Sequence, residues 1–351
     1  MDTQTDKTGI QIDRLAEWMD SRGLGSGPIE DVTLLAGGTQ NLITRFQRLD
    51  RQYVLRRPSL NPRPEANKTM MREAQVLAAL AGSGVPHPTL VATCSDESVL
   101  GACFYLMEPI SGFNAVNGMP EPHRSDPAMR RRMGFSLVDG AAALARLDYL
   151  AVGLEGFGRP ENFLERQVLR WQEQLSSYAR QEGWPGPRSL DGVGPLSEYL
   201  STHIPSGYQP GILHGDYQLA NVMYRYDSPQ LAAIVDWELS TIGDPLLDLA
   251  WIIATWRGYA PELPILQVEP WDGFPLVDEL IAHYADQSDR DLSGFNWYVV
   301  LACFKLGIIL EGTHARACAG KAPRETGDQL HAAAVALMQR GLVWSQRRVW
   351  L

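Results

Sequence analysis

The sequence is poor in cysteine and has no excess of positive charge. Its four cysteines in 351 residues are Cys94, Cys103, Cys303 and Cys318. No two of them have the close spacing of a zinc knuckle or a disulfide framework, so we expect reduced thiols. His314 would share a helical face with Cys318, but the sequence shows no further ligand for a metal there. The formal net charge of −10 argues against a nucleic-acid partner, because phosphate backbones are bound through clustered Lys and Arg.

Long apolar segments are also lacking. The longest apolar run, Val299–Leu310, is interrupted by Lys305 and is shorter than the ~20 residues of a membrane-spanning helix. The amino terminus is polar and has no apolar core of the kind found in secretion signals. We therefore expect a cytoplasmic protein with no membrane partner. The composition, 45% hydrophobic and 21% charged, is that of an ordinary globular chain with one large or two ordinary domains, and it leaves the oligomeric state open.

The most informative stretch is Gly211–Trp251. Its apolar runs Gly211–Leu213 and Leu231–Val235 predict two strands, and each run is followed by polar residues. The polar residues are His214, Gly215 and Asp216 after the first strand, Asp236 and Glu238 after the second, and Asn221 between the two strands.

Three of these side chains suit phosphoryl transfer, where catalysis is mostly positioning and charge neutralisation by Mg²⁺. Asp216 supplies a carboxylate for the attacking hydroxyl. Asn221 and Asp236 supply the hard oxygen ligands that Mg²⁺ prefers. An Asp followed five residues later by Asn, and then by a strand-terminal Asp, is also the spacing of the protein-kinase catalytic loop. Each residue alone is typical of a capped turn, so their ordered combination carries the prediction.

Other residues near this stretch are expected to support the loop. We expect His214 to brace it by packing and hydrogen bonding. Asp244 is placed to cap the helix that begins at Pro245, and Asp248, one turn later, to brace the catalytic loop. Elsewhere, Arg130, Arg131 and Arg132 are expected to form a solvent-exposed helix face. Helices are also predicted at about Asp126–Leu147, Leu164–Gln181, Leu276–Gln287, Phe295–Cys318 and Thr326–Gln346.

The motif HGDYQLAN resembles that of the aminoglycoside-phosphotransferase family of small-molecule kinases. The segments DWELSTIGDPLLDLAW and ACFKLGIILEGTHARA are similar to the kinase-like domain at the amino terminus of some acyl-CoA dehydrogenases. The likeness implies an α+β, two-lobed protein-kinase-like fold. Residues 1–108 would form a nucleotide-binding lobe, a small antiparallel sheet with one helix, and residues 109–351 a larger, mostly α catalytic and acceptor-binding lobe. It also implies ATP and Mg²⁺ as cofactors and a hydroxylated small molecule as acceptor.

A glycine-rich turn begins the predicted nucleotide site. It joins two of the three short strands expected at Val32–Leu35, Leu42–Leu49 and Tyr53–Arg56. Backbone amides of such a turn can approach phosphates without a Cβ in the way, although an ordinary hairpin is the alternative. The turn residues expected to bind nucleotide are Gly37, Gly38, Thr39, Gln40 and Asn41.

An ion pair is expected beside this turn. Arg56 ends the third strand where kinases carry a phosphate-binding Lys, and Glu73 lies in a predicted helix where kinases carry the partner of that Lys. Arg57, which we expect to face solvent on the opposite side of the strand, is a rival for the phosphate contact. An Arg in place of Lys keeps the charge and adds a bidentate fork.

The segment FYLMEPISG, from Phe104 to Gly112, resembles the hinge between the two lobes of this fold. An adenine base would bond to its backbone, and the expected positions are Met107, Glu108 and Ile110. An edge strand followed by a turn is the alternative interpretation of the same residues. The choice between ATP and GTP stays open.

The identity of the phosphate acceptor is the part of the function that the sequence specifies least. The segment after Arg324 has few acids, and it contains Arg340, Arg347 and Arg348. This composition disfavours an aminoglycoside. The resemblance to the kinase-like domain of acyl-CoA dehydrogenases implies instead a hydroxyacyl-CoA or a similar metabolite, whose anionic nucleotide arm would need Arg or Lys at the pocket mouth. A generic small-molecule phosphotransferase remains the broader interpretation. A nucleotide-binding pseudokinase is the alternative from another class. The presence of Asp216, Asn221 and Asp236 together favours the enzyme.

Overall fold

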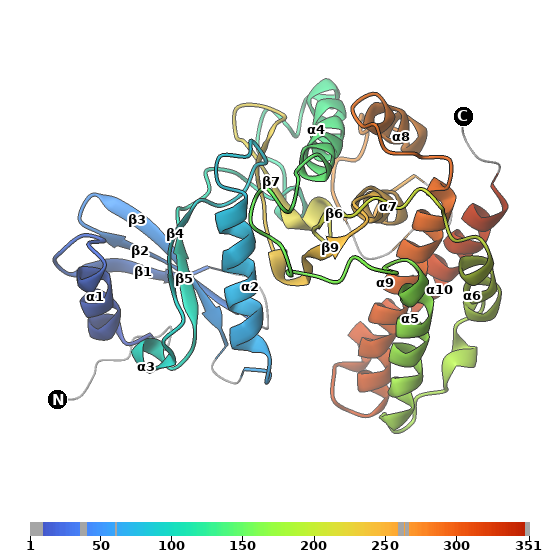
Figure 1. Cartoon of the computed structure of the whole chain (residues 1–351), viewed down its shortest axis with the longest axis horizontal. Helices are drawn as coiled ribbons and strands as arrows, with labels where there is room; N and C mark the ends of the chain where they lie inside the picture. The colour runs from blue at the N-terminus through green and yellow to red at the C-terminus, as the bar shows by residue number, and fades with distance from the viewer. Residues whose placement is uncertain (1–9, 36–40, 60–61, 259–262, 264–266, 348–351) are drawn as a thin grey trace. The chain divides into compact units, whose positions relative to one another are not determined.

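A computed structural model describes residues 10–35, 41–59, 62–258, 263 and 267–347 (Figure 1). The chain divides into two compact units. The first comprises Met1–Ser111, Val152–Leu154 and Ala232–Glu238, and all other residues belong to the second. The segment that carries Asp236 is therefore part of the amino-terminal unit, although it follows the predicted boundary at residue 108 in the sequence.

An antiparallel sheet of five strands forms the centre of the first unit (Figure 1). Its strands lie in the order β1-β2-β3-β5-β4. The pairing of β2 with β3 is continuous, from Asn41 opposite Pro58 to Arg48 opposite Arg51. The elements of this unit are α1 (Ile12–Ser21), β1 (Ile29–Leu34), β2 (Asn41–Arg48), β3 (Arg51–Pro58), α2 (Ala66–Ala79), β4 (Leu90–Cys94), α3 (Glu97–Leu100) and β5 (Phe104–Met107).

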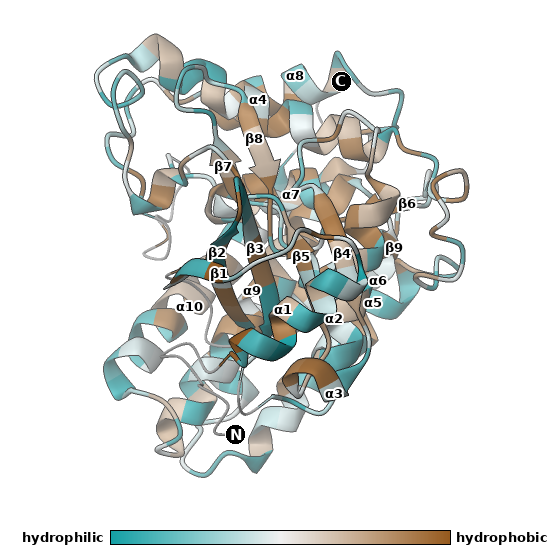
Figure 2. Ribbon diagram, turned by 90° about the vertical axis from the view of Figure 1, so that its left-hand side faces the viewer, coloured by the Kyte–Doolittle hydropathy of each residue, from teal (hydrophilic) through white to brown (hydrophobic). Residues whose placement is uncertain are grey.

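The two faces of this sheet carry different chemistry, because successive side chains of a strand point to opposite sides. One face packs against α1, where the Trp18 ring meets the Phe104 ring edge to face at 4.8 Å between centroids, and Leu55 is buried in the same cluster. In Figure 2 hydrophilic colour marks much of α1 and hydrophobic colour marks the strand segments behind it. The opposite face presents Arg56 and its cross-strand partner Tyr105 to α2.

The second unit is mostly helical. Its long helix α9 (Phe295–Cys318) packs against α10 (Arg324–Gln346), and against α7 (Leu246–Thr255) and α5 (Glu165–Ser177). The short strand β6 (Gly211–Leu213) pairs antiparallel with β9 (Thr241–Gly243). Its other α-helices and strands are α4 (Pro127–Ala145), α6 (Val193–Thr202), β7 (Val222–Tyr224) and α8 (Val277–Ala285). The strand β8 (Leu231–Ile234) begins at the last residue before the segment Ala232–Glu238 of the first unit and leads to Asp236.

Helix α9 is apolar around most of its circumference. By length and composition alone it could cross a membrane, but 78% of its apolar window is buried inside the structure. A helix that is apolar all round is also typical of the core of a globular unit. Its ends, Phe295 and Cys318, are those predicted from the sequence.

The structure corrects the prediction that Arg130, Arg131 and Arg132 all lie on a solvent-exposed helix face. Arg130 does not belong to a solvent-exposed face: it is 2% exposed, and its Nη2 lies 2.8 Å from a carboxylate oxygen of Asp272. Its neighbours Arg131 and Arg132 are exposed as expected. The buried guanidinium also donates to the carbonyl oxygens of His123 and Arg124, which explains how a charge can be accommodated there.

The carboxy-terminal arginines were used as an argument against an aminoglycoside acceptor, and the structure does not support this use for two of them. Arg340 is fully buried and donates to the carbonyl oxygens of Ala254 (2.6 Å) and Trp256 (3.0 Å). Arg347 pairs with Asp278 at 2.7 Å. These side chains therefore hold α10 in place. Arg348 lies outside the described residues.

Candidate functional site

The loop that carries Asp216 is held by a buried carboxylate. Asp248 of α7 accepts hydrogen bonds from the backbone amides of His214 (2.7 Å) and Gly215 (2.9 Å). Burial raises the pKa of the Asp248 carboxyl above its ordinary value. His214 is fully buried, and its Nδ1 accepts a hydrogen bond from the Asp216 amide at 3.3 Å. The bracing roles expected for Asp248 and His214 are therefore present in the structure.

Gly215 is required by the shape of this loop. Its φ is +89°, a conformation that L side chains rarely adopt. A Cβ at this position would lie 2.6 Å from the backbone oxygen of Leu239, which has no freedom to move away as a side chain would. This loop therefore has no room for the Arg that protein kinases carry at the matching position.

The Asp216 carboxylate is fixed by three donors. Its Oδ1 accepts hydrogen bonds from Trp251 Nε1 (2.7 Å) and Gln218 Nε2 (2.6 Å), and its Oδ2 accepts one from Asn221 Nδ2 (2.8 Å). The residue is half-buried, so the carboxylate is oriented without being sealed off from solvent. The sequence predicted Asp216 but not the supporting roles of Trp251 and Gln218, which depend on the folded loop.

Asn221 has a defined amide orientation. Its Nδ2 also donates to the backbone oxygen of Asp216 at 2.9 Å, so the nitrogen is turned inward and Oδ1 is directed away from Asp216. The turn before it is held by Asn114, whose Nδ2 donates to the carbonyl oxygens of Ala220 (2.7 Å) and Val222 (3.0 Å). Asn221 thus offers, with its Oδ1, the neutral oxygen that the predicted metal site requires.

Lys305 is a contributor that sequence reasoning missed. Its Nζ donates to the carbonyl oxygen of Gly215 at 2.9 Å and lies 4.4 Å from the centroid of the Trp251 ring. Burial lowers the pKa of Lys305 to about 8, although Asp216 and Asp248 oppose that shift. A charge in the middle of an otherwise apolar run was the signal that could have identified it.

In the first unit, Arg56 joins two acids. Its Nε lies 2.9 Å from Glu73 Oε2, and its Nη2 lies 2.8 Å from Asp236 Oδ1. Tyr105 donates from its hydroxyl to Glu73 Oε2 at 3.1 Å. Burial raises the pKa of the Glu73 carboxyl. For Arg56, burial acts to lower the pKa, but Glu73, Tyr105 and Asp236 together raise it above its ordinary value, so the guanidinium stays charged.

The predicted ion pair between Arg56 and Glu73 is thus formed, whereas the expectation for Arg57 was wrong. Arg57 is 5% exposed and does not face solvent, and its Nε donates to the carbonyl oxygen of Pro58 at 3.3 Å. Arg56 is the one of the two that contacts the acids of this unit. Its role in binding phosphate stays a prediction.

Asp236 lies in a turn with an uncommon backbone. Its φ is +67°, which is rare for residues other than Gly and is tolerated best by Asn and Asp. The turn is closed by Trp237, whose Nε1 donates to the carbonyl oxygen of Ile234 at 3.0 Å. The Asp236 side chain is 39% exposed, so its carboxylate is accessible while one oxygen pairs with Arg56. Such conformations cluster at functional sites.

The other predicted nucleotide positions are described only in part. Gly37, Gly38, Thr39 and Gln40 lie outside the described residues, and Asn41 begins β2.

In the predicted hinge, Met107 ends β5 and Ile110 is half-buried. The Glu108 amide donates to the Thr89 carbonyl oxygen at 2.9 Å, and the Glu108 carboxylate pairs with Arg51 at 2.7 Å. That amide is therefore engaged within the protein. The role of Met107, Glu108 and Ile110 in binding a base stays a prediction.

The chain matches a known family along most of its length. Residues 31–280 match the family described as "Phosphotransferase enzyme family". The chain is 32% identical over 324 residues to acyl-CoA dehydrogenase family member 11 of Rattus norvegicus, and 31% identical over 313 residues to family member 10 of Mus musculus. These matches cover 90% and 87% of this chain but 40% and 28% of the relatives. The chain therefore spans less than half the length of either relative.

Solved structures share the fold. A protein of Ralstonia eutropha, provisionally named an aminoglycoside phosphotransferase, is 29% identical with a TM-score of 0.78, and the match covers 95% of this chain and 98% of that one. A complex of APH(4)-Ia with ADP and hygromycin B is 14% identical with a TM-score of 0.57, and covers 93% and 97%. The predicted protein-kinase-like fold, an antiparallel sheet followed by a mostly helical part, is confirmed.

Proposed function

Because the chain belongs to the phosphotransferase enzyme family, we propose that it is a kinase that moves the γ-phosphate of ATP to a hydroxyl of a small molecule. The observation that carries this proposal is the Asp216 carboxylate, which three side-chain donors hold in one orientation while it stays accessible. A fixed carboxylate of this kind suits the orientation and deprotonation of an attacking hydroxyl. A pseudokinase would have no need to keep it so ordered.

Nucleotide binding is assigned to the first unit. Arg56, whose charge is maintained by Glu73, would bind phosphate oxygens, and the Glu108 carbonyl and Ile110 amide would bond to the base. The relative APH(4)-Ia binds ADP, and a related aminoglycoside 2′-phosphotransferase-IIIa binds GDP, which supports a purine nucleotide without choosing between the two. ATP is the donor that we test first.

The donor set also fits Mg²⁺. Asn221 would contribute its Oδ1, which the hydrogen bonds of Nδ2 turn outward, and Asp236 would contribute its accessible carboxylate. Both are hard oxygen ligands. When bound, Mg²⁺ would neutralise phosphate charge. In the chain itself, Arg56 Nη2 lies 2.8 Å from one oxygen of Asp236 and so holds that carboxylate in place.

For the acceptor we propose a hydroxyacyl-CoA or a similar hydroxylated metabolite. Support comes from the relatives of similar sequence, which are named as members of the acyl-CoA dehydrogenase family. The carboxy-terminal arginines no longer contribute, since Arg340 and Arg347 are engaged within the second unit. Kanamycin serves as the contrasting acceptor, because it is bound by a more distant structural relative.

Mass spectrometry tests the proposal directly. Purified protein is incubated with ATP or GTP, with and without Mg²⁺, and with a 4-hydroxyacyl-CoA or kanamycin, and the products are examined for the added phosphate. We expect an Mg²⁺-dependent phosphorylated product, formed faster from the 4-hydroxyacyl-CoA. The Asp216→Asn variant should lose about 10²-fold or more of the turnover while still binding ATP. Near wild-type turnover in this variant would refute the role of Asp216, and the reverse ranking of acceptors would refute the acceptor class.

A further inference from the structure

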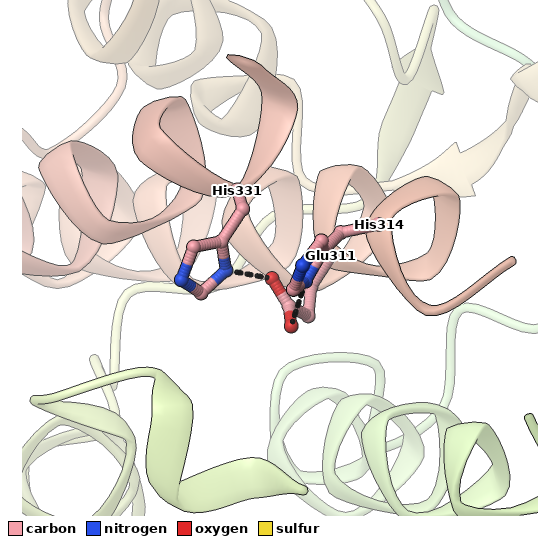
Figure 3. A group of neighbouring side chains, drawn as sticks. All are labelled: Glu311, His314 and His331. Atoms are coloured by element: carbon pink, nitrogen blue, oxygen red, sulfur yellow. Dashed lines mark hydrogen bonds and ion pairs between the residues drawn. The ribbon is translucent and has the colours of Figure 1, made fainter. Parts of the chain in front are cut away.

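A second cluster of ionisable side chains lies in the second unit, on the helices α9 and α10 (Figure 3). Glu311 and His314 are three residues apart on α9, and His331 comes from α10. Glu311 Oε1 lies 3.0 Å from His314 Nδ1, and Glu311 Oε2 lies 2.7 Å from His331 Nδ1. Figure 3 shows one carboxylate between two imidazole rings, with both Nδ1 atoms turned toward it.

The cluster is buried, which makes it unlike an ordinary group of surface acids. Glu311 is fully buried, His314 is 5% exposed, and only His331 reaches the surface in part. Trp184 adds a further donor, since its Nε1 lies 2.6 Å from Glu311 Oε1. Removing a carboxylate from water costs free energy unless it gains hydrogen-bond partners. Here Trp184, His314 and His331 all contact the two carboxylate oxygens of Glu311.

We propose that Glu311, His314 and His331 form a binding site for Zn²⁺. One potential ligand atom from each residue lies within 4.8 Å of the others, a spacing that small rotations of the side chains convert into a shared coordination sphere. Two imidazole nitrogens with one carboxylate are a ligand set that zinc accepts, with a water in the fourth position. The nitrogen ligands disfavour Mg²⁺, which prefers oxygen.

The groups behind the ligands support this site. Imidazoles that bind a metal usually donate their other ring N–H to a neighbouring acceptor, which fixes the tautomer. The other nitrogen of His314, Nε2, lies 3.5 Å from Cys318 Sγ and 3.8 Å from Asp328 Oδ1. With Nε2 protonated, the lone pair of His314 Nδ1 is directed toward Glu311 and can bind a cation. Trp184 fixes the orientation of the Glu311 carboxylate, because its Nε1 donates a hydrogen bond to Glu311 Oε1.

The two rings change tautomer when the metal binds. Without a cation, each Nδ1–H of a neutral ring donates a hydrogen bond to the Glu311 carboxylate. On binding Zn²⁺, each ring loses the Nδ1 proton to solvent and takes one up on Nε2, so that the Nδ1 lone pair binds the metal with no net change in protons on the rings. The partly exposed edge of His331 provides the entry path. The bound ion ties α9 to α10 and, through Glu311, to Trp184.

Metal titration distinguishes this site from a network of hydrogen bonds alone. The full chain is freed of metal with a chelator and titrated with Zn²⁺ by calorimetry and with Co²⁺ by electronic absorption. We expect one ion per chain and the intense visible bands of four-coordinate Co²⁺. The melting temperature should rise with Zn²⁺, and Mg²⁺ should not displace the bound Co²⁺. Absence of stoichiometric binding would overturn the proposal.

Matched variants locate the bound ion. The variant His331→Gln, at a partly exposed position, should bind Zn²⁺ at least ~100-fold more weakly, and Asp328→Asn, behind His314, about 10-fold more weakly. His283 pairs with Asp139 elsewhere in this unit, so His283→Gln should bind as the wild type does. Circular dichroism checks that each variant folds. Wild-type affinity in His331→Gln would show that the ion binds elsewhere and would refute the site.

Discussion

Lys305 donates a hydrogen bond from its Nζ to the carbonyl oxygen of Gly215, the residue directly before Asp216, at a distance of 2.9 Å. The same ammonium lies 4.4 Å from the centroid of the Trp251 ring, and Trp251 Nε1 in turn donates to Asp216. One cation therefore contacts both the backbone and the indole that position the carboxylate. We infer that Lys305 is a positioning residue for Asp216.

Replacement of this lysine tests that role. Lys305→Met should lower kcat by about 10–100-fold, the scale expected when a reacting group shifts by about 1 Å, while the KM for ATP stays near the wild-type value. The KM is unaffected because the proposed nucleotide groups belong to the first unit. Steady-state kinetics at varied ATP separates the two parameters. An unchanged kcat would contradict the positioning role.

The pH profile gives an independent test of the same lysine. Burial lowers its pKa from 10.5 to about 8, with Asp216 and Asp248 favouring the charged form and Arg170 opposing it. The ammonium is therefore present below pH 8 and is lost as the pH rises through about 8. We expect the kcat of the wild type to decrease as the pH rises through about 8, and the kcat of Lys305→Met to show no such decrease. If the same decrease persists in the variant, it must come from the titration of another group.

The ion pair of the first unit predicts coupled effects. Arg56→Ala and Glu73→Ala should each weaken ATP binding, and the double variant should lose less than the sum of the two, with a coupling energy of about 0.5–3 kcal/mol. Binding titrations of the four proteins measure it. Since Arg57 is buried, the suitable control is Arg45→Ala, at an exposed position of β2, which should bind as the wild type does. Strict additivity would show that Arg56 and Glu73 act separately.

The proposed Mg²⁺ ligands should differ in their effects. Asp236→Ala should abolish Mg²⁺-dependent turnover, because it removes an anionic ligand and the partner of Arg56. Asn221→Ala removes a neutral ligand and one donor to Asp216, so the activity should be weakened less and partly restored by excess Mg²⁺. Turnover measured against Mg²⁺ concentration tests both. Negligible effects from both variants would rule out this metal site.

The shape of the catalytic loop predicts a stability effect. Gly215→Ala adds a Cβ at 2.6 Å from the Leu239 backbone oxygen and forces a side chain into positive φ, so it should cost more than the ~1–3 kcal/mol of backbone strain alone. Gly156→Ala is the matched control, because its φ is +72° and no atom lies within 4 Å of the added Cβ. Chemical denaturation compares them. Equal losses would show that the close approach to Leu239 does not matter.

Local patterns in the sequence were sufficient for the framework of this protein. The sequence placed Arg56 at the end of a strand and Glu73 in the helix that follows, and the two residues do form an ion pair. The spacing of HGDYQLAN brings Asp216 and Asn221 together, because a short loop leaves few ways to arrange residues five positions apart. The apolar run around Lys305 predicted the helix that contains it. Each of these features depends on neighbours in the chain or on a regular period.

Only the tertiary structure decided which charged side chains are buried and what they contact. Arg130 and Arg340 look like surface residues in the sequence, yet they donate to the carbonyl oxygens of Asp272 and Ala254 in distant segments. Lys305 reaches the Asp216 loop, and His331 reaches Glu311, from positions 90 and 20 residues away. The favourable energy of these contacts comes from the enclosure of a charge by groups from several elements. Such an enclosure exists only after the helices have packed, so no local pattern could predict it.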